Sequence, residues 1–181
     1  MKLAELKEQV NIPKGVSVTV QDGLFAVKGP KGENSRNLFN KKLSYSIEGD
    51  NVVVSCKNAT KREKTIFYTA VSHIKNLISG AQQGFSYKLK VCSGHFPMSV
   101  AVKGDTLEVK NFIGEAVPRR LKLNPKTKVV VEGQVITVEG IDVEQTGQQA
   151  AAIELLCRRV GFDRRIFQDG IYITHKGDEQ L

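Results

Sequence analysis

The sequence predicts an α+β fold of two tandem duplicated domains, each an antiparallel β-sheet with one α-helix packed on it. Three observations support this: an internal repeat, hairpin signals early in each copy, and helical periodicity late in each copy. With 181 residues, the chain can form two domains of about ninety residues each. We place the N-terminal domain at residues 1–82 and the C-terminal domain at residues 83–181.

The internal repeat is clearest between residues 20–33 (VQDGLFAVKGPKGE) and residues 102–115 (VKGDTLEVKNFIGE). Identical residue types recur 82 positions apart, among them Gly32 and Gly114. Later matches lie at slightly different offsets, as loop insertions would produce. Solenoid units are only about 20 to 50 residues long, so this period indicates two copies of one domain.

The first part of each copy predicts β-hairpins. Residues 16–27 alternate apolar and polar on both sides of Asp22-Gly23, which is a strong hairpin signal. A second hairpin is expected around Gly49-Asp50-Asn51, between residues 45–47 and 52–54. Gly29-Pro30-Lys31-Gly32 has the G-x-x-G form of a KH nucleotide clamp, but strand-like residues flank it, so we interpret it as a tight turn.

The last part of each copy predicts a helix. Thr60 and Glu63 have the spacing of a capping box, and Gly80 is the expected helix end. Asp142 is the expected N-cap of the second helix, and Gly161 its end. The apolar faces predicted from helical spacing are Ile66, Ala70, Ile74, Leu77 and Ile78 in the first helix, and Thr146, Ala150, Ile153, Cys157 and Val160 in the second.

The composition favours a polyanionic partner. The net charge is +8, and no apolar run approaches the roughly 18 residues that span a bilayer, so we expect no membrane insertion. The three scattered cysteines fit reduced, cytosolic thiols. Cys92 and His95 form a C-x-x-H pair without a second ligand pair, so the sequence predicts no metal and no cofactor.

The strongest functional signal is residues 158–173, RRVGFDRRIFQDGIYI. Four arginines fall within eight positions, and Phe162, Phe167 and Tyr172 are interleaved with them. Arginine binds phosphate and guanine edges with a fixed fork of donors and stacks on bases, so this segment predicts an RNA-binding surface. The alternative is a basic helix end that complements its own dipole, followed by a solvated turn.

Charge clustering favours the C-terminal domain as the RNA-binding half. The N-terminal half has the larger net charge, but six of the eight arginines lie after residue 84. Arg119, Arg120 and Lys122 form one cluster and the arginines of residues 158–165 another. Because salt screens charges beyond about 8 to 10 Å, locally concentrated charge matters more than a net value averaged over a surface.

Several blocks of the sequence resemble one family. They include GFSYKLKV (84–91), SGHFPMSV (93–100), NFIGE (111–115), GQQAAAIE (147–154) and RRIFQDGIY (164–172). These blocks resemble the large-subunit ribosomal protein L-six family, in its archaeal and eukaryotic branch, from about Ile12 to Thr174.

The resemblance implies a structural constituent of the large ribosomal subunit in the cytoplasm, not an enzyme. It implies that the C-terminal domain binds large-subunit rRNA near the sarcin–ricin loop, with neighbouring proteins of the stalk base and translational GTPases close by. The resemblance and the basic clusters together give these candidate rRNA-binding residues: Lys90, His95, Arg119, Arg120, Lys122, Arg158, Arg159, Arg164, Arg165, Gln168 and Gly170.

Two other function classes remain open from the sequence. One is an RNA-processing enzyme that uses Cys92 and His95, which loss of activity on Cys92→Ser would indicate. The other is a non-ribosomal adaptor that binds RNA or protein, for example through exposed sheet edges.

Overall fold

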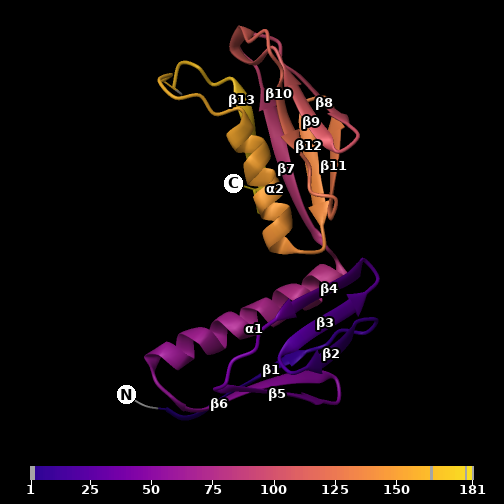
Figure 1. The fold of residues 1–181 in the computed structure, drawn as a ribbon, viewed down its shortest axis with the longest axis vertical. Helices are drawn as coiled ribbons and strands as arrows, with labels where there is room; N and C mark the ends of the chain where they lie inside the picture. The colour runs from indigo at the N-terminus through magenta and orange to yellow at the C-terminus, as the bar shows by residue number, and fades with distance from the viewer. Residues whose placement is uncertain (1–2, 164, 178, 181) are drawn as a thin grey trace. The chain divides into compact units, whose positions relative to one another are not determined.

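A computed structural model describes residues 3–163, 165–177 and 179–180 of the chain. The chain divides into two compact units, Met1–Gly84 and Phe85–Leu181. Figure 1 shows that each unit contains one long helix packed beside β-strands. The predicted α+β fold of tandem sheet-and-helix domains is confirmed. Among the described residues, no helix is long and apolar enough to cross a bilayer.

The N-terminal unit has two three-stranded antiparallel sheets, with strand orders β1-β6-β5 and β2-β3-β4, and the helix α1 contacts strands of both. Its elements are β1 (Leu3–Asn11), β2 (Ser17–Gln21), β3 (Leu24–Gly29), β4 (Gly32–Asn37), β5 (Leu43–Glu48), β6 (Asn51–Ala59) and α1 (Lys61–Gln82). The helix therefore continues two residues past Gly80, the end expected from the sequence.

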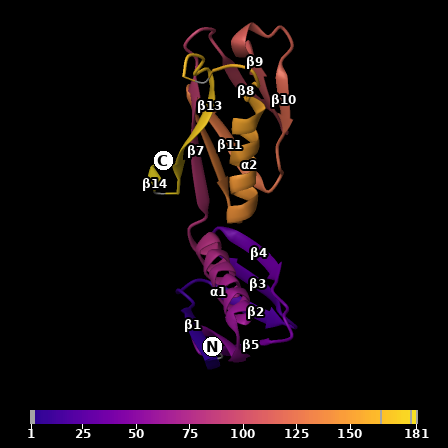
Figure 2. The ribbon, with the colours of Figure 1, turned by 90° about the vertical axis from the view of Figure 1, so that its left-hand side faces the viewer.

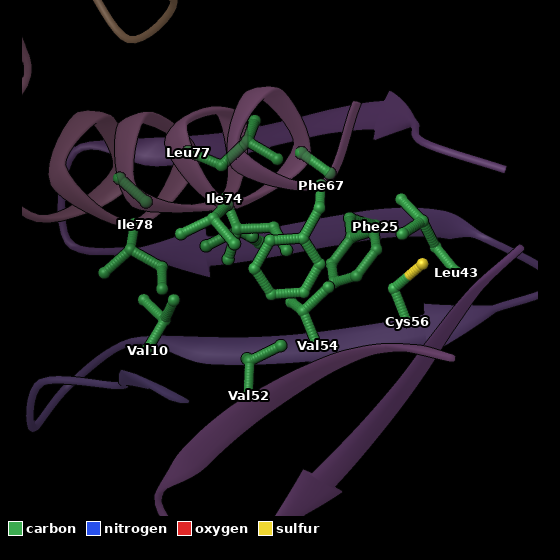
Figure 3. Close-up of a cluster of buried hydrophobic side chains, with 14 of the residues drawn as sticks. Val10, Phe25, Leu43, Val52, Val54, Cys56, Phe67, Ile74, Leu77 and Ile78 are labelled. Atoms are coloured by element: carbon green, nitrogen blue, oxygen red, sulfur yellow. The ribbon is translucent and has the colours of Figure 1, made fainter. Parts of the chain in front are cut away.

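The core of the N-terminal unit lies between α1 and the sheets. Figure 3 shows Phe67 and Ile74 of α1 pointing toward Phe25 of β3 and Val54 of β6. All four side chains are at most 1% exposed. Burying each one stabilises the fold by roughly 1.5–3 kcal/mol. Of the apolar face predicted from helical spacing, Ala70, Ile74, Leu77 and Ile78 are buried, whereas Ile66 is only partly buried and Phe67, which was not predicted, is buried in the core.

Local turn and cap signals account for the chain reversals in this unit. Asp22 and Gly23 have φ values of 47° and 80°, which is the left-handed pair that a two-residue hairpin requires. Gly29 pairs with Gly32 across β3 and β4, so the G-x-x-G segment is a tight turn, as expected. The Thr60 backbone N–H donates to the Glu63 carboxylate at 3.0 Å in the predicted capping box.

The C-terminal unit has a five-stranded sheet of order β11-β12-β7-β13-β14 and a three-stranded sheet of order β10-β9-β8 (Figure 2). Its elements are β7 (Phe85–Cys92), β8 (Ser99–Lys103), β9 (Thr106–Lys110), the 3-10 turn η1 (Phe112–Gly114), β10 (Arg119–Lys122), β11 (Thr127–Glu132), β12 (Val135–Gly140), α2 (Val143–Leu156), β13 (Gly170–Lys176) and β14 (Glu179–Gln180).

The strand orders show where the duplication holds and where it ends. The order β1-β6-β5 corresponds to β7-β12-β11, and β2-β3-β4 corresponds to β8-β9-β10. The chain differs after the two helices. Strand β7 follows α1 directly, whereas α2 is followed by residues 157–169 and then by β13, which pairs with β7. The arginine-rich segment therefore lies in the part that the C-terminal copy adds to the shared plan.

The second helix is shorter than its predicted apolar face. It ends at Leu156, and Val160 is 93% exposed, so the prediction that Val160 is buried was wrong. The physical reason is a contact from outside the helix: Arg119 Nη1 donates to the carbonyls of Leu156 at 2.6 Å and Arg158 at 3.2 Å. These bonds satisfy carbonyls that another helical turn would have used.

Candidate nucleic-acid interface

Asp169 joins two loops at one end of the C-terminal unit. One loop, residues 93–98, connects β7 to β8, and the other, residues 157–169, connects α2 to β13. The Asp169 carboxylate is fully buried and accepts bonds from the Gly94 and His95 backbone amides and from His95 Nδ1 at 2.6 Å. It therefore fixes the His95 loop to the arginine-rich loop.

The bonds to Asp169 keep it charged. Burial raises the pKa of this carboxyl, but the hydrogen bonds from His95 and Gly94 outweigh it and hold the pKa below its ordinary value. Because the ionised carboxylate is only an acceptor, His95 Nδ1 is the donor in this bond. The other ring nitrogen, Nε2, is then directed away from Asp169 and can contact a ligand.

The hydrogen bonds to Asp169 place the His95 ring beside the arginine-rich loop, where it begins a row of flat side chains. The rings of His95 and Phe167 are 5.1 Å apart, and those of Phe167 and Phe162 are 5.0 Å apart in an edge-to-face arrangement. The Arg159 guanidinium lies 4.4 Å from the centre of the Phe162 ring. Cationic and aromatic groups in one row are the components from which proteins build base-stacking surfaces.

Arg119 is directed into the unit, although the sequence placed it among the RNA contacts. Its Nε and Nη2 donate to the two Glu115 carboxylate oxygens at 2.8 and 2.7 Å, and its guanidinium lies 4.4 Å from the centre of the Phe112 ring. With the two carbonyl bonds at the end of α2, every guanidinium nitrogen has a partner. The geometry gives Arg119 a positioning role beneath the loop.

Replacing Arg119 with alanine is expected to lower the free energy of unfolding by about 2–4 kcal/mol, because charged hydrogen bonds contribute roughly 1.5–3 kcal/mol each. Arg119→Lys keeps the charge but not the planar fork, so it should recover little of the loss. Urea denaturation would measure both variants. A lysine variant as stable as the native protein would show that the fork geometry is unimportant.

Arg120 faces the opposite side of β10 and belongs to a cationic cluster around Glu108. The Glu108 side chain is only 6% exposed, and its oxygens lie 3.2 Å from Arg120 Nη2 and 2.7 Å from Lys103 Nζ. The bond from Lys103 is the main cause that holds the Glu108 pKa below its ordinary value. Lys110 Nζ is 3.9 Å away. The sequence did not single out Lys103 and Lys110, although Lys110 follows Glu108 by two positions on β9 and Lys103 lies on the paired strand β8.

The remaining candidates fall into two groups. Arg158 is exposed just after α2, and Arg165 is 90% exposed, with its guanidinium bonded to both Asp163 oxygens. Gln168 is exposed in the same loop, and Gly170 is buried where β13 begins. The structure thus brings His95, Arg158, Arg159, Arg165, Gln168 and Gly170 to the joined loops.

Two candidates lie on strands and not in these loops, and one is not described. Lys90 is exposed on β7, and Lys122 is exposed on β10. Arg164 lies outside the described residues. Within the part of the chain that the structure describes, no three His, Cys, Asp or Glu side chains are grouped to hold a metal ion.

Comparison with known proteins gives a family match over most of the chain. The family described as ribosomal protein L6 matches residues 12–84 and 96–170. A protein of Saccharolobus solfataricus named large ribosomal subunit protein uL6 is 42% identical over 97% of this chain and 98% of its own length. Proteins of the same name from Sulfurisphaera tokodaii and Methanosarcina mazei are 41% and 43% identical, over 99% and 95% of this chain. The chain therefore belongs to the ribosomal protein L6 family.

Proposed function

We propose that the chain is a structural protein of the large subunit of cytoplasmic ribosomes, not an enzyme, and that residues 83–181 are its main rRNA-binding half. Family membership supports the first part. The second part rests on one observation: the buried Asp169 carboxylate fastens a loop bearing exposed arginines to the His95 loop. This link between the two loops holds the exposed arginine side chains in fixed positions, which a phosphate-binding surface needs.

The contacts that we propose divide by their chemistry. Exposed arginines and lysines neutralise phosphates, His95 offers Nε2, Gln168 offers its amide, and Gly170 lets the backbone come close. Arg119 serves by positioning Glu115 and the end of α2. The proposed contact residues are Lys90, His95, Arg120, Lys122, Arg158, Arg159, Arg164, Arg165, Gln168 and Gly170.

We propose further that the contacted rRNA lies near the sarcin–ricin loop. The neighbours would then be proteins of the stalk base, and translational GTPases would act close by. Resemblance to the family supports this location. A chemical footprint of the subunit's RNA, recorded with and without this protein, tests it, because protection elsewhere would move the site.

Binding to cognate large-subunit rRNA is expected to weaken steeply with salt. Contacts to about five phosphates would give a slope of roughly −4 for log K against log salt concentration, since each contact releases condensed counterions. Filter binding between about 50 and 300 mM salt measures this slope. A slope near zero would contradict a phosphate-binding surface.

Co-sedimentation distinguishes a ribosomal protein from an RNA adaptor. A structural protein should remain with large subunits through a high-salt sucrose gradient, because its many contacts are released together only slowly. A protein found only in the light fractions would favour the adaptor.

A further inference from the structure

A cavity of about 480 Å³ lies in the C-terminal unit, bordered by the end of α2, the η1 turn, residues 157–169 and the start of β13. Its lining includes Ile113, Leu155, Arg159, Phe162, Phe167 and Tyr172. Pockets that hold small molecules measure about 300–1,000 Å³ and combine apolar and aromatic side chains with placed polar groups. We propose that this cavity takes up one unpaired nucleobase of the bound RNA. The inference rests on the proposed rRNA binding and names a specific subsite within it.

Two flat groups give the cavity its preference for a planar ligand. The Arg159 guanidinium covers Phe162, and Phe162 meets Phe167 at an interplanar angle of 74°. A nucleobase can stack on both the guanidinium plane and a phenyl ring, whereas a phosphate binds only the N–H edge of the guanidinium and gains nothing from the phenyl rings. The cavity therefore favours a base over the RNA backbone.

Apolar side chains stand exposed beside these flat groups. Val160, which borders the cavity, is 93% exposed, and Leu155 is 56% exposed. Single exposed apolar residues are ordinary, but these two border the same cavity, which the charged residues Arg158 and Glu154 also line. An inserted base would remove their apolar surface from water, which is favourable.

Backbone strain lies at the wall formed by Ile113. This β-branched residue has φ 48° and ψ 42°, in the left-handed region that such residues rarely adopt. Asn111, two residues earlier and with φ 57°, donates a hydrogen bond from its side-chain amide to the Pro97 carbonyl at 3.1 Å and so holds the turn. Strained residues of this kind are concentrated at ligand sites, where the surrounding structure maintains them.

Positive charge beside the cavity suits the phosphates that flank an unstacked, unpaired nucleotide. Arg158 and Arg159 are exposed next to the cavity and can neutralise the phosphates on either side of such a nucleotide. Proteins recognise RNA bases mainly in loops and bulges, where the bases are unstacked and can be stacked on aromatic groups or arginine. The expected ligand is therefore a nucleotide in a loop or bulge of the rRNA.

Ultraviolet cross-linking of the full chain to cognate large-subunit rRNA tests this proposal. After digestion with nuclease and trypsin, a nucleotide adduct is expected on residues 160–164, which contain Phe162, or on residues 166–176, which contain Phe167 and Tyr172. The control peptide is residues 37–41, whose Phe39 is 62% exposed in the N-terminal unit. RNA binding without an adduct on residues 160–176, or with equal adducts on residues 37–41, would overturn the base subsite and leave rRNA binding intact.

A matched pair of variants supplies the second measurement. Phe162→Leu keeps apolar volume but removes the ring, so affinity should fall roughly 5- to 30-fold, as expected for loss of one stacked base. The salt slope should stay unchanged, because no phosphate contact is lost. Phe162→Tyr keeps a stacking ring and should bind as the native protein does. Equal affinities for all three proteins would overturn the subsite, whereas failure of the native protein to bind would overturn the proposed function itself.

Discussion

Replacing Asp169 with alanine is expected to lower the free energy of unfolding by about 2–4 kcal/mol at neutral pH. The variant loses three hydrogen bonds to a buried carboxylate, two from backbone amides and one from His95 Nδ1. This loss of unfolding free energy is smaller than the summed energies of three charged hydrogen bonds, because in the variant the Gly94 and His95 amides can donate to water instead. Urea denaturation followed by circular dichroism would measure the change.

Asp169→Asn is the matched control, since its amide oxygen can still accept from the two backbone amides. It loses the charge and also the bond from His95 Nδ1, because an NH2 group replaces the oxygen that accepts this bond. The Asp169 pKa is lowered in the folded protein, because the hydrogen bonds from His95 and Gly94 outweigh burial. Its charge therefore stabilises the fold above the unfolded pKa of about 3.9 and ceases to do so as the pH falls through the lower folded value. The stability gap between native protein and variant should close in acid. A gap that persists unchanged at pH 2, roughly two units below the unfolded pKa, would contradict this.

Replacing Arg158 and Arg165 together with alanine is expected to weaken binding of cognate large-subunit rRNA by about 2–3 kcal/mol, or roughly 30- to 150-fold. Both side chains are exposed in the joined loops, so their loss should alter folding little. The salt slope should become shallower by about 1.5–2, since two phosphate contacts are lost. Filter-binding titrations at several salt concentrations measure both quantities.

The control for the arginine pair lies in the N-terminal unit. Lys41→Ala with Lys57→Ala removes the same charge from two exposed positions there. Under the proposed function, replacing this lysine pair should weaken binding by less than about threefold. Salt screens the attraction between RNA phosphates and charges that lie away from the contact surface. Equal losses from the two double variants would assign RNA binding to charge in general, and a larger loss from the lysine pair would assign it to the N-terminal unit.

Features set by neighbouring residues were predictable from the sequence. The Asp22-Gly23 turn, the capping box of Thr60 and Glu63, and the Asp142 N-cap all involve atoms only a few residues apart. The duplication was predictable because the same residue types recur at nearly constant offset. Each of these signals needs no knowledge of the tertiary fold.

Features set by distant residues were not predictable in the same way. Residues 3–11 have apolar positions at Leu3, Leu6 and Val10, a spacing that also suits a helix, and their strand form follows from pairing with β6. The end of α2 at Leu156 depends on Arg119, which is 37 positions away. The division of each unit into two sheets likewise depends on long-range pairing.

The same distinction applies to the candidate interface. The arginines and aromatic rings of residues 158–173 stand out in the sequence because they are close together. Asp169 does not, because its partners Gly94 and His95 lie about 75 positions earlier. Arg119 was predicted to contact RNA together with Arg120 and Lys122, although alternation along a strand directs Arg119 and Arg120 to opposite faces.

The self-contained pairing of the first unit has a consequence for biosynthesis. Every strand and the helix of Met1–Gly84 find their partners within that unit. Translation proceeds from the N-terminus, so this half can close its core while the nascent chain is still growing. The arginine-rich loop, residues 157–169, is translated after this unit and so follows an N-terminal half that can already be compact. Under the proposed function, the unfolded polycation that stray RNA could meet is then the C-terminal half alone, and not the whole chain.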